Sequence, residues 1–391
     1  MIDRLLEDRL IKLADWFPVV SLTGPRQSGK STLIKKAFPS YVYINLENPE
    51  VRNAAQQDPV GFIKNRPDRL IIDEAQYVPE LFNMIQVASD ERGSVGQYVL
   101  SGSQNFLLLK SIQQSLAGRV GLLTLLPFSY AELCRAHQRD NDAINLDTFM
   151  LTGGYPRIYD TGMPRDVFLS NYVSTYIERD AGEMLNVRNL SQFRTLLGLL
   201  AHSVGALINY ASLAADVGVD VRTIKSWISI LESSYIIFQL QPYFKNGRKR
   251  LTKAPKLYFY DTGLLCSLLQ IAEASQLVDH PLRGEIVENL IISERIKQHL
   301  NCGEEPALYF YRDESKREID LLDMTDAAAP LAVEIKSGAT YRSNFARHLG
   351  TVGDELGIPE EGRYVVYRGS ERYRADRVTV VPAEQFVLQS M

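Results

Sequence analysis

Apolar residues in the first third of the chain form short continuous runs separated by amphipathic or polar stretches. These runs lie at residues 19–22, 41–46, 69–72, 97–100 and 121–126. Each has the length of a strand and is rich in aliphatic side chains, which is typical of a parallel sheet buried on both faces. Residues 2–16 place their apolar side chains at helical intervals and predict an amphipathic helix beside that sheet. The pattern therefore predicts an α/β domain over residues 1–150.

The first apolar run leads into a loop bounded by two glycines and then into a helical pattern. The loop has the GxxxxGKS spacing of a P-loop, in which backbone N–H groups surround phosphate oxygens at a helix N-terminus. Lys30 is expected to meet the β- and γ-phosphates of ATP, and Ser31 to place its hydroxyl on Mg²⁺. The residues expected to bind the nucleotide are Gly24, Pro25, Arg26, Gln27, Ser28, Gly29, Lys30, Ser31 and Thr32.

Polar residues follow the third and fourth apolar runs, where buried parallel strands would end at a ligand crevice. Asp73 is expected to hold Mg²⁺ through water, and Glu74 to orient or deprotonate the attacking water, as in a Walker B motif. Gln104 or Ser103 is expected to act as the polar sensor of the γ-phosphate, and Asn105 is the remaining candidate. An ordinary strand-ending turn is the alternative for this polar cluster.

Arg119 precedes the fifth apolar run and allows two interpretations. It could reach the γ-phosphate of a neighbouring subunit as an arginine finger. It could equally be a cation at the end of a helix, where it complements the helix dipole. Position alone does not decide between these two roles.

The middle of the chain predicts a helix-turn-helix followed by a β-hairpin, which together make a winged helix. The two helices fall within residues 209–231 with a turn at Gly218, and the second helix exposes Arg222 and Lys225. The hairpin tip adds a local basic patch that would suit a DNA backbone. Its candidate contacts are Lys245, Arg248, Lys249 and Arg250, and residues 245–256 contain six basic residues and no acid. Protein binding or packing is the alternative role of this element.

Charged residues in the last third of the chain follow the order of a PD-(D/E)xK nuclease. Glu288 lies on a predicted helix, Asp320 at the start of a strand, and Glu334 and Lys336 on one face of the next strand. The three carboxylates could share a divalent metal, while Lys336 positions or activates the hydrolytic water. The alternative is a fold kept as a nucleic-acid or assembly scaffold without cleavage.

Several motifs together resemble a widespread prokaryotic group of AAA-type P-loop ATPases. They are GPRQSGKST, LIIDEAQ, LSGSQ, LAGRV followed by LLPFSYAEL, and GGYPRIY, and the resemblance covers almost the whole chain. The C-terminal half of that group is a domain of unknown function related to restriction-endonuclease folds. The resemblance implies an AAA+ architecture and an oligomeric state, and it favours Arg119 as an arginine finger. It implies no particular substrate.

Length and composition set the outer limits of these predictions. The 391 residues suggest two or three domains, which we place at 1–150 (ATPase), 151–200 (helical lid), 201–260 (winged helix) and 261–391 (restriction-endonuclease-like). A net charge of −4 means that any DNA-binding surface must be local. Three widely spaced cysteines favour a reducing cytosol, and neither a signal peptide nor a membrane span is expected.

These observations predict a cytoplasmic AAA+ ATPase that uses ATP and Mg²⁺, acts on DNA, and has metal-dependent nuclease competence. A homo-oligomer is expected, with a hexameric ring as the candidate, and no membrane partner. A competing class is a signalling or assembly ATPase whose winged helix and C-terminal domain bind protein partners. A nucleotide switch with slow turnover is a third.

Overall fold

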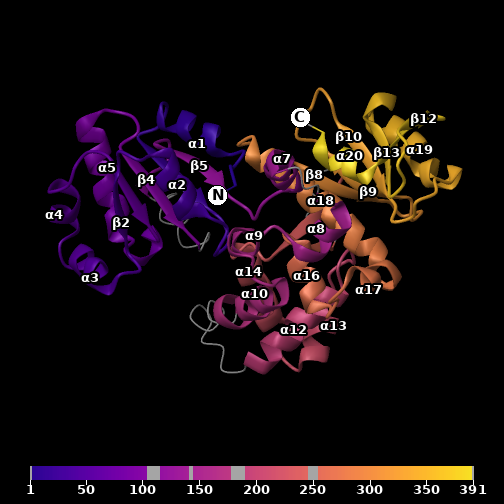
Figure 1. Ribbon diagram of the computed structural model, residues 1–391, viewed down its shortest axis with the longest axis horizontal. Helices are drawn as coiled ribbons and strands as arrows, with labels where there is room; N and C mark the ends of the chain where they lie inside the picture. Colours follow the sequence, from indigo (N-terminus) through magenta and orange to yellow (C-terminus); the bar gives the residue numbers. More distant parts are fainter. Residues whose placement is uncertain (1, 104–114, 141–143, 178–189, 245–253, 390–391) are drawn as a thin grey trace.

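The N-terminal part of the protein is a parallel five-stranded sheet with helices on both faces (Figure 1). The computed structural model describes residues 2–103, 115–140, 144–177, 190–244 and 254–389. The strands are β1 (Val19–Thr23), β2 (Val42–Asn45), β3 (Leu70–Asp73), β4 (Tyr98–Gly102) and β5 (Val120–Thr124). Their spatial order is β2-β3-β4-β1-β5, and every neighbouring pair is parallel. The carboxyl ends of β1 and β3 therefore meet at the same edge of the sheet.

Side chains of β1 alternate between the two faces of this sheet. Val19 belongs to a cluster with α4 and α5, whereas Val20 and Leu22 pack against α1 and α2. The helices around the sheet are α1 (Glu7–Ala14), α2 (Lys30–Ala37), α3 (Pro49–Gln57), α4 (Pro59–Lys64) and α5 (Glu80–Arg92). Both layers bury continuous apolar surface, which is the main stabilising contribution to such a domain.

The first helix is shorter than the amphipathic pattern of residues 2–16 predicts. It begins only at Glu7, because the Leu5 N–H donates to Glu132 Oε1 at 2.9 Å instead of entering a helical turn. At its other end Trp16 lies beyond the helix and is 51% exposed. Tertiary contacts of the N-terminal segment therefore replace its first helical turn.

A helical region follows the five-stranded sheet, and its helices α10, α12 and α13 lie at the bottom of Figure 1. Its described helices are α7 (Tyr130–Asp140), α8 (Leu146–Thr152), α9 (Pro156–Thr161), α10 (Arg165–Tyr172), α12 (Leu190–His202), α13 (Tyr210–Val217) and α14 (Val221–Ser233). Two later helices, α16 (Thr262–Leu268) and α17 (Ala274–Asp279), pack among them. The helix α10 passes into a π-helical turn over Val173–Ile177.

The C-terminal sheet is mixed and has the order β12-β13-β11-β10-β9-β8-β6-β7. Its strands are β6 (Ile237–Pro242), β7 (Lys256–Phe259), β8 (Leu308–Arg312), β9 (Glu318–Asp323), β10 (Leu331–Ile335), β11 (Arg363–Tyr367), β12 (Tyr373–Ala375) and β13 (Val378–Pro382). The helices that pack on it are α18 (Arg283–Asn301), α19 (Arg347–Leu356) and α20 (Ala383–Leu388). Because β6 pairs in parallel with β8, the β6–β7 hairpin extends this sheet.

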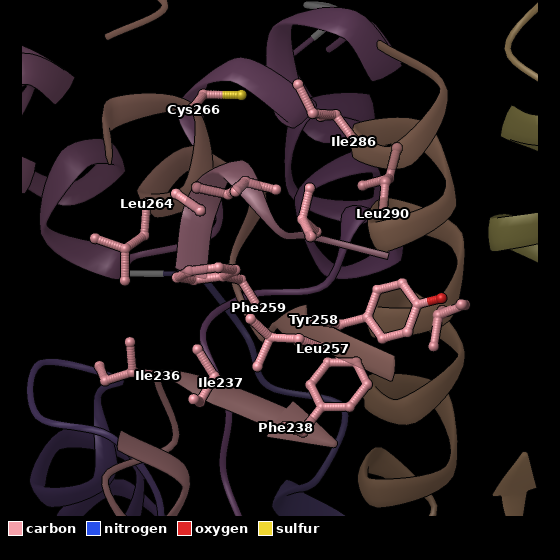
Figure 2. Packing of buried hydrophobic residues seen from close by; sticks show 14 of the residues in the cluster. Ile236, Ile237, Phe238, Leu257, Tyr258, Phe259, Leu264, Cys266, Ile286 and Leu290 are labelled. Atoms are coloured by element: carbon pink, nitrogen blue, oxygen red, sulfur yellow. The ribbon is translucent and has the colours of Figure 1, made fainter. Parts of the chain in front are cut away.

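One apolar cluster joins the helical region to the C-terminal sheet. Figure 2 shows part of this cluster, to which β6 contributes Ile237, β7 contributes Phe259 and α18 contributes Leu290. Asn289 locks the contact, since its side chain accepts from the Phe259 N–H at 2.7 Å and donates to the Phe259 carbonyl at 3.0 Å. The predicted α/β class is confirmed as a parallel N-terminal sheet, a helical region and a mixed C-terminal sheet.

Candidate functional site

The predicted P-loop connects β1 to α2 in a backbone conformation that requires glycine at two positions. Gly24 has a φ of +145°, and a Cβ there would lie 2.1 Å from the Leu125 carbonyl oxygen. Gly29 has a φ of +92° and directly precedes the first residue of α2. Both values lie where an L side chain is strained, so the loop depends on the two glycines that the motif contains.

Lys30 is buried at the start of α2 with its ammonium turned back into the loop. It donates to the Gly24 carbonyl at 2.9 Å and to the Pro25 carbonyl at 2.8 Å. Arg26 forms an ion pair with Glu47 at 3.6 Å, and its carbonyl accepts from the Tyr172 hydroxyl at 3.3 Å. The loop is thus tied to the segment after β2 and to α10.

The two predicted magnesium residues of this site lie in direct contact. Ser31 Oγ donates to Asp73 Oδ2 at 2.6 Å, at the carboxyl end of β3. Tyr43 from β2 donates to the same oxygen at 2.5 Å, and Ser101 from β4 donates to Asp73 Oδ1. Burial, followed by the bond to Asp73, raises the pKa of Tyr43, so its hydroxyl stays a donor. Sequence reasoning missed Tyr43 and Ser101, although each lies on a strand next to β3.

Glu74 occupies a left-handed conformation with a φ of +55°, which is uncommon for a residue other than glycine. Its Oε2 accepts from Ser103 Oγ at 3.1 Å and from Gln76 Nε2 at 2.5 Å. Ser103 was one of the predicted sensor residues, whereas Gln104 and Asn105 lie outside the described residues. The carboxylate is therefore held at the mouth of the site by its own turn and by the end of β4.

A cavity of about 480 Å³ opens between the P-loop and α9. It is lined by six of the predicted nucleotide-binding residues together with Glu47, Glu74 and one side of α9. The complete lining is Arg26, Gln27, Gly29, Lys30, Ser31, Thr32, Glu47, Glu74, Pro156, Arg157, Asp160 and Thr161. The helix α9 follows the Gly153-Gly154 turn, so residues from the helical region complete the site.

Arg4 supports the P-loop from the N-terminal segment, and sequence reasoning missed it. Its guanidinium donates to the Ser28 carbonyl at 2.9 Å, to the Leu126 carbonyl at 2.6 Å and to Glu132 Oε1 at 3.0 Å. The Arg4 side chain is 7% exposed and the Glu132 side chain is fully buried. Burial lowers the pKa of Arg4 from its usual value, and the Glu132 carboxylate opposes that shift.

Arg119 lies far along the sheet from the P-loop of its own chain. It directly precedes β5, whose first residue pairs with Val19 at the amino end of β1, whereas the P-loop leaves the carboxyl end. Its guanidinium binds Asp90 of α5 through two bonds, with Nε donating to Oδ1 at 2.6 Å and Nη2 to Oδ2 at 3.0 Å. The structure therefore does not bring Arg119 to the site formed by Lys30 and Asp73.

Arg222 and Lys225 are exposed on the first half of α14, as the pattern predicts. Asp220 caps this helix by accepting the backbone N–H groups of Arg222 at 2.8 Å and Thr223 at 2.9 Å. The Lys225 ammonium lies 5.4 Å from the centre of the Tyr210 ring. The other predicted DNA contacts, Lys245, Arg248, Lys249 and Arg250, fall outside the described residues.

The four predicted nuclease residues converge at one place on the C-terminal sheet. Lys336 donates to Glu334 Oε1 at 2.8 Å and to Asp320 Oδ2 at 3.4 Å, and the Ile335 N–H donates to that same Asp320 oxygen at 2.7 Å. Burial and then the charge of Asp320 raise the pKa of Glu288 to about 7 and that of Glu334 to about 8. Glu288 on α18 is therefore close enough to interact electrostatically with the strand residues.

Lys256 enters the same cluster from β7, which corrects its expected place in the exposed basic patch. It is 5% exposed, and its ammonium lies 3.2 Å from Glu288 Oε1 and 2.7 Å from Glu318 Oε1. Tyr258 also donates to Glu288 Oε1, at 2.5 Å. An amphipathic lysine at the end of a polar hairpin is usually solvated, but β7 is a buried strand.

The carboxylates of this cluster were also predicted to be metal ligands. Within the part of the chain that the structure describes, no group of three histidine, cysteine or acidic side chains is arranged to hold a metal ion. Glu334 Oε2 is nevertheless a buried acceptor without a hydrogen-bond partner. Glu334 and Asp320 thus suit a cation chemically, while Glu288 is already bound to Lys256.

No helix among the described residues is long and apolar enough to cross a membrane.

Comparison with known proteins places three domains along the chain. Residues 17–134 match an AAA domain, residues 143–275 a domain of unknown function (DUF8612), and residues 283–386 another domain of unknown function (DUF4143). An AAA domain implies nucleotide binding, typically with Mg²⁺, and is the basis for describing the protein as an AAA-type ATPase.

Relatives align over most of the chain. The uncharacterized protein Rv2008c of Mycobacterium tuberculosis is 32% identical over 377 residues, which is 95% of this chain and 81% of the relative. The uncharacterized protein MJ1544 of Methanocaldococcus jannaschii is 23% identical over 76% of this chain and 70% of its own length. The solved Walker-type ATPase of Pyrococcus abyssi is 15% identical, with a TM-score of 0.45 over 69% of this chain and 96% of its own. The chain therefore belongs to the family of proteins that join an N-terminal AAA domain with a P-loop to a C-terminal domain of unknown function (DUF4143).

Proposed function

We propose that this protein hydrolyses ATP at the P-loop and uses the hydrolytic cycle to act on DNA. The observation that carries the ATPase half is the pair of contacts beyond β3, where Asp73 meets Ser31 and Glu74 meets Ser103. The two adjacent carboxylates thus suit two different tasks in phosphoryl transfer, one at the metal ion and one at the attacking water. Asp73 faces the residue that follows the P-loop lysine, and Glu74 faces the cavity.

The residues that would hold Mg²⁺ are Ser31 and Asp73, whose oxygens are already in contact. The bound ion would neutralise phosphate charge. Lys30 would exchange its two loop carbonyls for phosphate oxygens, which are stronger acceptors for an ammonium. Glu74 would accept the proton of the attacking water, and Ser103 would keep its carboxylate aimed into the cavity.

DNA is the preferred target because α13 and α14 form a helix-turn-helix whose second helix exposes two basic side chains. Ile224, Trp227 and Ile228 are buried, whereas Arg222 and Lys225 on the opposite face are exposed. In the proposed winged helix, α14 would enter a groove, and the β6–β7 hairpin, which also extends the C-terminal sheet, would be the wing. The competing proposal, a signalling or assembly ATPase, would use the same face to bind a protein partner.

The deciding experiment measures ATP hydrolysis alone and with single-stranded, duplex or branched DNA. We expect one DNA form to stimulate hydrolysis and its binding to weaken steeply with salt. Lys30→Ala should abolish hydrolysis in every condition, and Arg222→Ala with Lys225→Ala should remove the stimulation only. A rate indifferent to every DNA, with no DNA binding at low salt, would favour the protein-partner function. A very slow rate in all conditions would favour a nucleotide switch.

A metal-dependent nuclease in a restriction-endonuclease-like C-terminal domain is a second candidate function. It is favoured by the convergence of Glu288, Asp320, Glu334 and Lys336 from one helix and two neighbouring strands. Asp320 and Glu334 would hold the metal, and Lys336 would orient the hydrolytic water. We expect Asp320→Ala and Lys336→Ala each to abolish DNA cleavage. Cleavage that persists unchanged in both variants would come from a contaminant and would refute this function.

A further inference from the structure

Lys256 is fixed beside the acidic cluster of the C-terminal sheet by the backbone of its strand. Lys256 is the first residue of β7, pairs with Leu240 of β6, and forms a further bridge with Leu207. Its side chain is buried, and its ammonium lies 5.4 Å from the centre of the Phe310 ring. Because both strand neighbours hold the backbone, the ammonium is a fixed part of the cluster and not a mobile surface charge.

Glu288 is bound almost entirely by β7. Its Oε1 receives the Lys256 ammonium at 3.2 Å and the Tyr258 hydroxyl at 2.5 Å. Across the cluster Lys336 joins Glu334 and Asp320. Each end of the acidic cluster therefore has its own lysine, one from β7 and one that follows β10.

The charge balance of the cluster bears on which ions it can take. The ion pairs of the cluster join four carboxylates to three cations and leave a single excess negative charge when all are ionised: Glu288, Glu318, Asp320 and Glu334 with Lys256, Arg312 and Lys336. Without Lys256 the excess would be two, which matches a divalent cation. Glu334 Oε2, buried and without a hydrogen-bond partner, would remain available to such an ion.

We propose that Lys256 is a built-in cation of this cluster that competes with divalent metal ions for Glu288. With Lys256 in place, only Asp320 and Glu334, which already share Lys336, are left to take a metal, and the cluster binds divalent ions weakly. The proposal shares its residues with the second candidate function, the nuclease, but it does not require that the protein cleaves DNA. It concerns metal affinity and not cleavage.

The test measures Mn²⁺ binding to the nucleotide-free full-length protein by isothermal titration calorimetry. We expect Lys256→Met to bind one Mn²⁺ at least tenfold more tightly than the wild-type protein. Lys256→Met combined with Glu288→Gln should lose that gain, and Lys256→Arg, which keeps the charge, should resemble the wild type. Mn²⁺ binding that survives Glu288→Gln comes from Asp320 and Glu334 without Glu288, or from another site such as the one at Ser31 and Asp73.

Thermal melting provides a second readout, since an ion that binds only the folded state raises the melting temperature. Mn²⁺ should raise the melting temperature of Lys256→Met and leave that of the wild-type protein nearly unchanged. Lys256→Gln serves as the second variant if Lys256→Met does not fold.

Two results would overturn the proposal. One is a wild-type protein that already binds Mn²⁺ tightly in a manner that depends on Glu288, which can be measured whether or not the Lys256 variants fold. The other is a folded Lys256→Met protein with unchanged affinity. Failure of DNA cleavage in every variant would refute only the nuclease function, because metal binding is measured without DNA.

Discussion

At the residue scale, Asp73 links the P-loop to two neighbouring strands. It accepts hydrogen bonds from Ser31 after the P-loop lysine, Tyr43 on β2 and Ser101 on β4. A carboxylate that accepts several hydrogen bonds is held in one orientation. Its neighbour Glu74 has fewer fixed bonds and faces the cavity. Adjacent residues of the same type thus differ in role because their surroundings differ.

Replacing Glu74 by glutamine should separate ATP binding from hydrolysis. The amide keeps the shape but cannot accept a proton, so we expect kcat to fall by about a hundredfold or more, the usual contribution of a general base. The nucleotide Kd should change little, as measured by fluorescence with a labelled ATP analogue. Glu80→Gln, an exposed position on α5, is the matched control. Unchanged turnover in Glu74→Gln would remove Glu74 from the mechanism.

Glu232 gives a prediction on pH. Burial raises its pKa to about 7 from an ordinary 4.5, although Gln239 opposes the shift. The folded state therefore holds a proton that the unfolded state has lost, and the stability from this group falls as pH rises from about 4.5 to about 7. Glu232→Gln should stabilise the protein by roughly 1 to 3 kcal/mol at pH 8, discounted for partial exposure, and hardly at pH 4.

Thermal melting at both pH values measures this difference. Glu91→Gln, which replaces an exposed carboxylate on α5, should show no such pH-dependent gain. An equal effect of Glu232→Gln at both pH values would mean that Glu232 is not a buried acid.

At the element scale, the segment before α1 and helix α9 complete a P-loop that β1 and α2 only begin. Arg4 binds the Ser28 carbonyl from one side, and Pro156 and Asp160 of α9 line the cavity from the other. Neither element belongs to the five-stranded sheet. The nucleotide site therefore depends on packing between the sheet, the N-terminal segment and the helical region.

Arg4→Met should destabilise the N-terminal domain, because it leaves the buried Glu132 carboxylate without its guanidinium partner. Removing one member of a buried ion pair costs about 3 to 5 kcal/mol in typical cases. We expect a clearly lower melting temperature and weaker nucleotide binding, since the Ser28 carbonyl loses its donor. Lys12→Met on the exposed side of α1 is the control. A loss below about 1 kcal/mol would contradict this role, since it would match an exposed pair.

At the scale of the whole molecule, the end of β1 touches the start of the C-terminal sheet. Tyr235, between α14 and β6, lies with its hydroxyl 2.7 Å from Thr23 Oγ1, and Thr23 directly precedes the P-loop. Tyr235 also has a φ of +57°. A cavity of about 500 Å³ adjoins this contact, lined by residues of β5, β6 and α18. This contact joins the end of β1 to the segment that follows α14.

Arg119 allows a prediction on assembly. Since it lies at the opposite end of the sheet from its own P-loop, it can serve hydrolysis only in a neighbouring subunit. Arg119→Ala should therefore bind ATP but hydrolyse it slowly. Mixing it with Lys30→Ala should restore part of the activity, because each variant supplies what the other lacks. Arg135→Ala, exposed on α7, is the control. Full activity of Arg119→Ala alone would make Arg119 a structural partner of Asp90.

Short-range patterns were enough to predict the strands of the N-terminal sheet. The five apolar runs became the five parallel strands, and the glycine spacing at 24 and 29 matches two positive φ angles. Such features depend on neighbouring residues, because backbone sterics and the burial of both sheet faces act over a few positions. The exposed arginine and lysine of α14 follow in the same way from helical periodicity.

The sequence by itself determined the α/β class, the P-loop with its adjacent carboxylates, and which charged residues of the C-terminal third occupy neighbouring strands. Only the tertiary structure decided the partners that come from distant parts of the chain. Arg4 meets Ser28, Tyr235 meets Thr23, and Lys256 is buried against Glu288 instead of facing solvent. The reason is physical. The periodicity of apolar residues shows which face of a helix or strand is buried, but the charged side chains that contact that face depend on how the elements pack together.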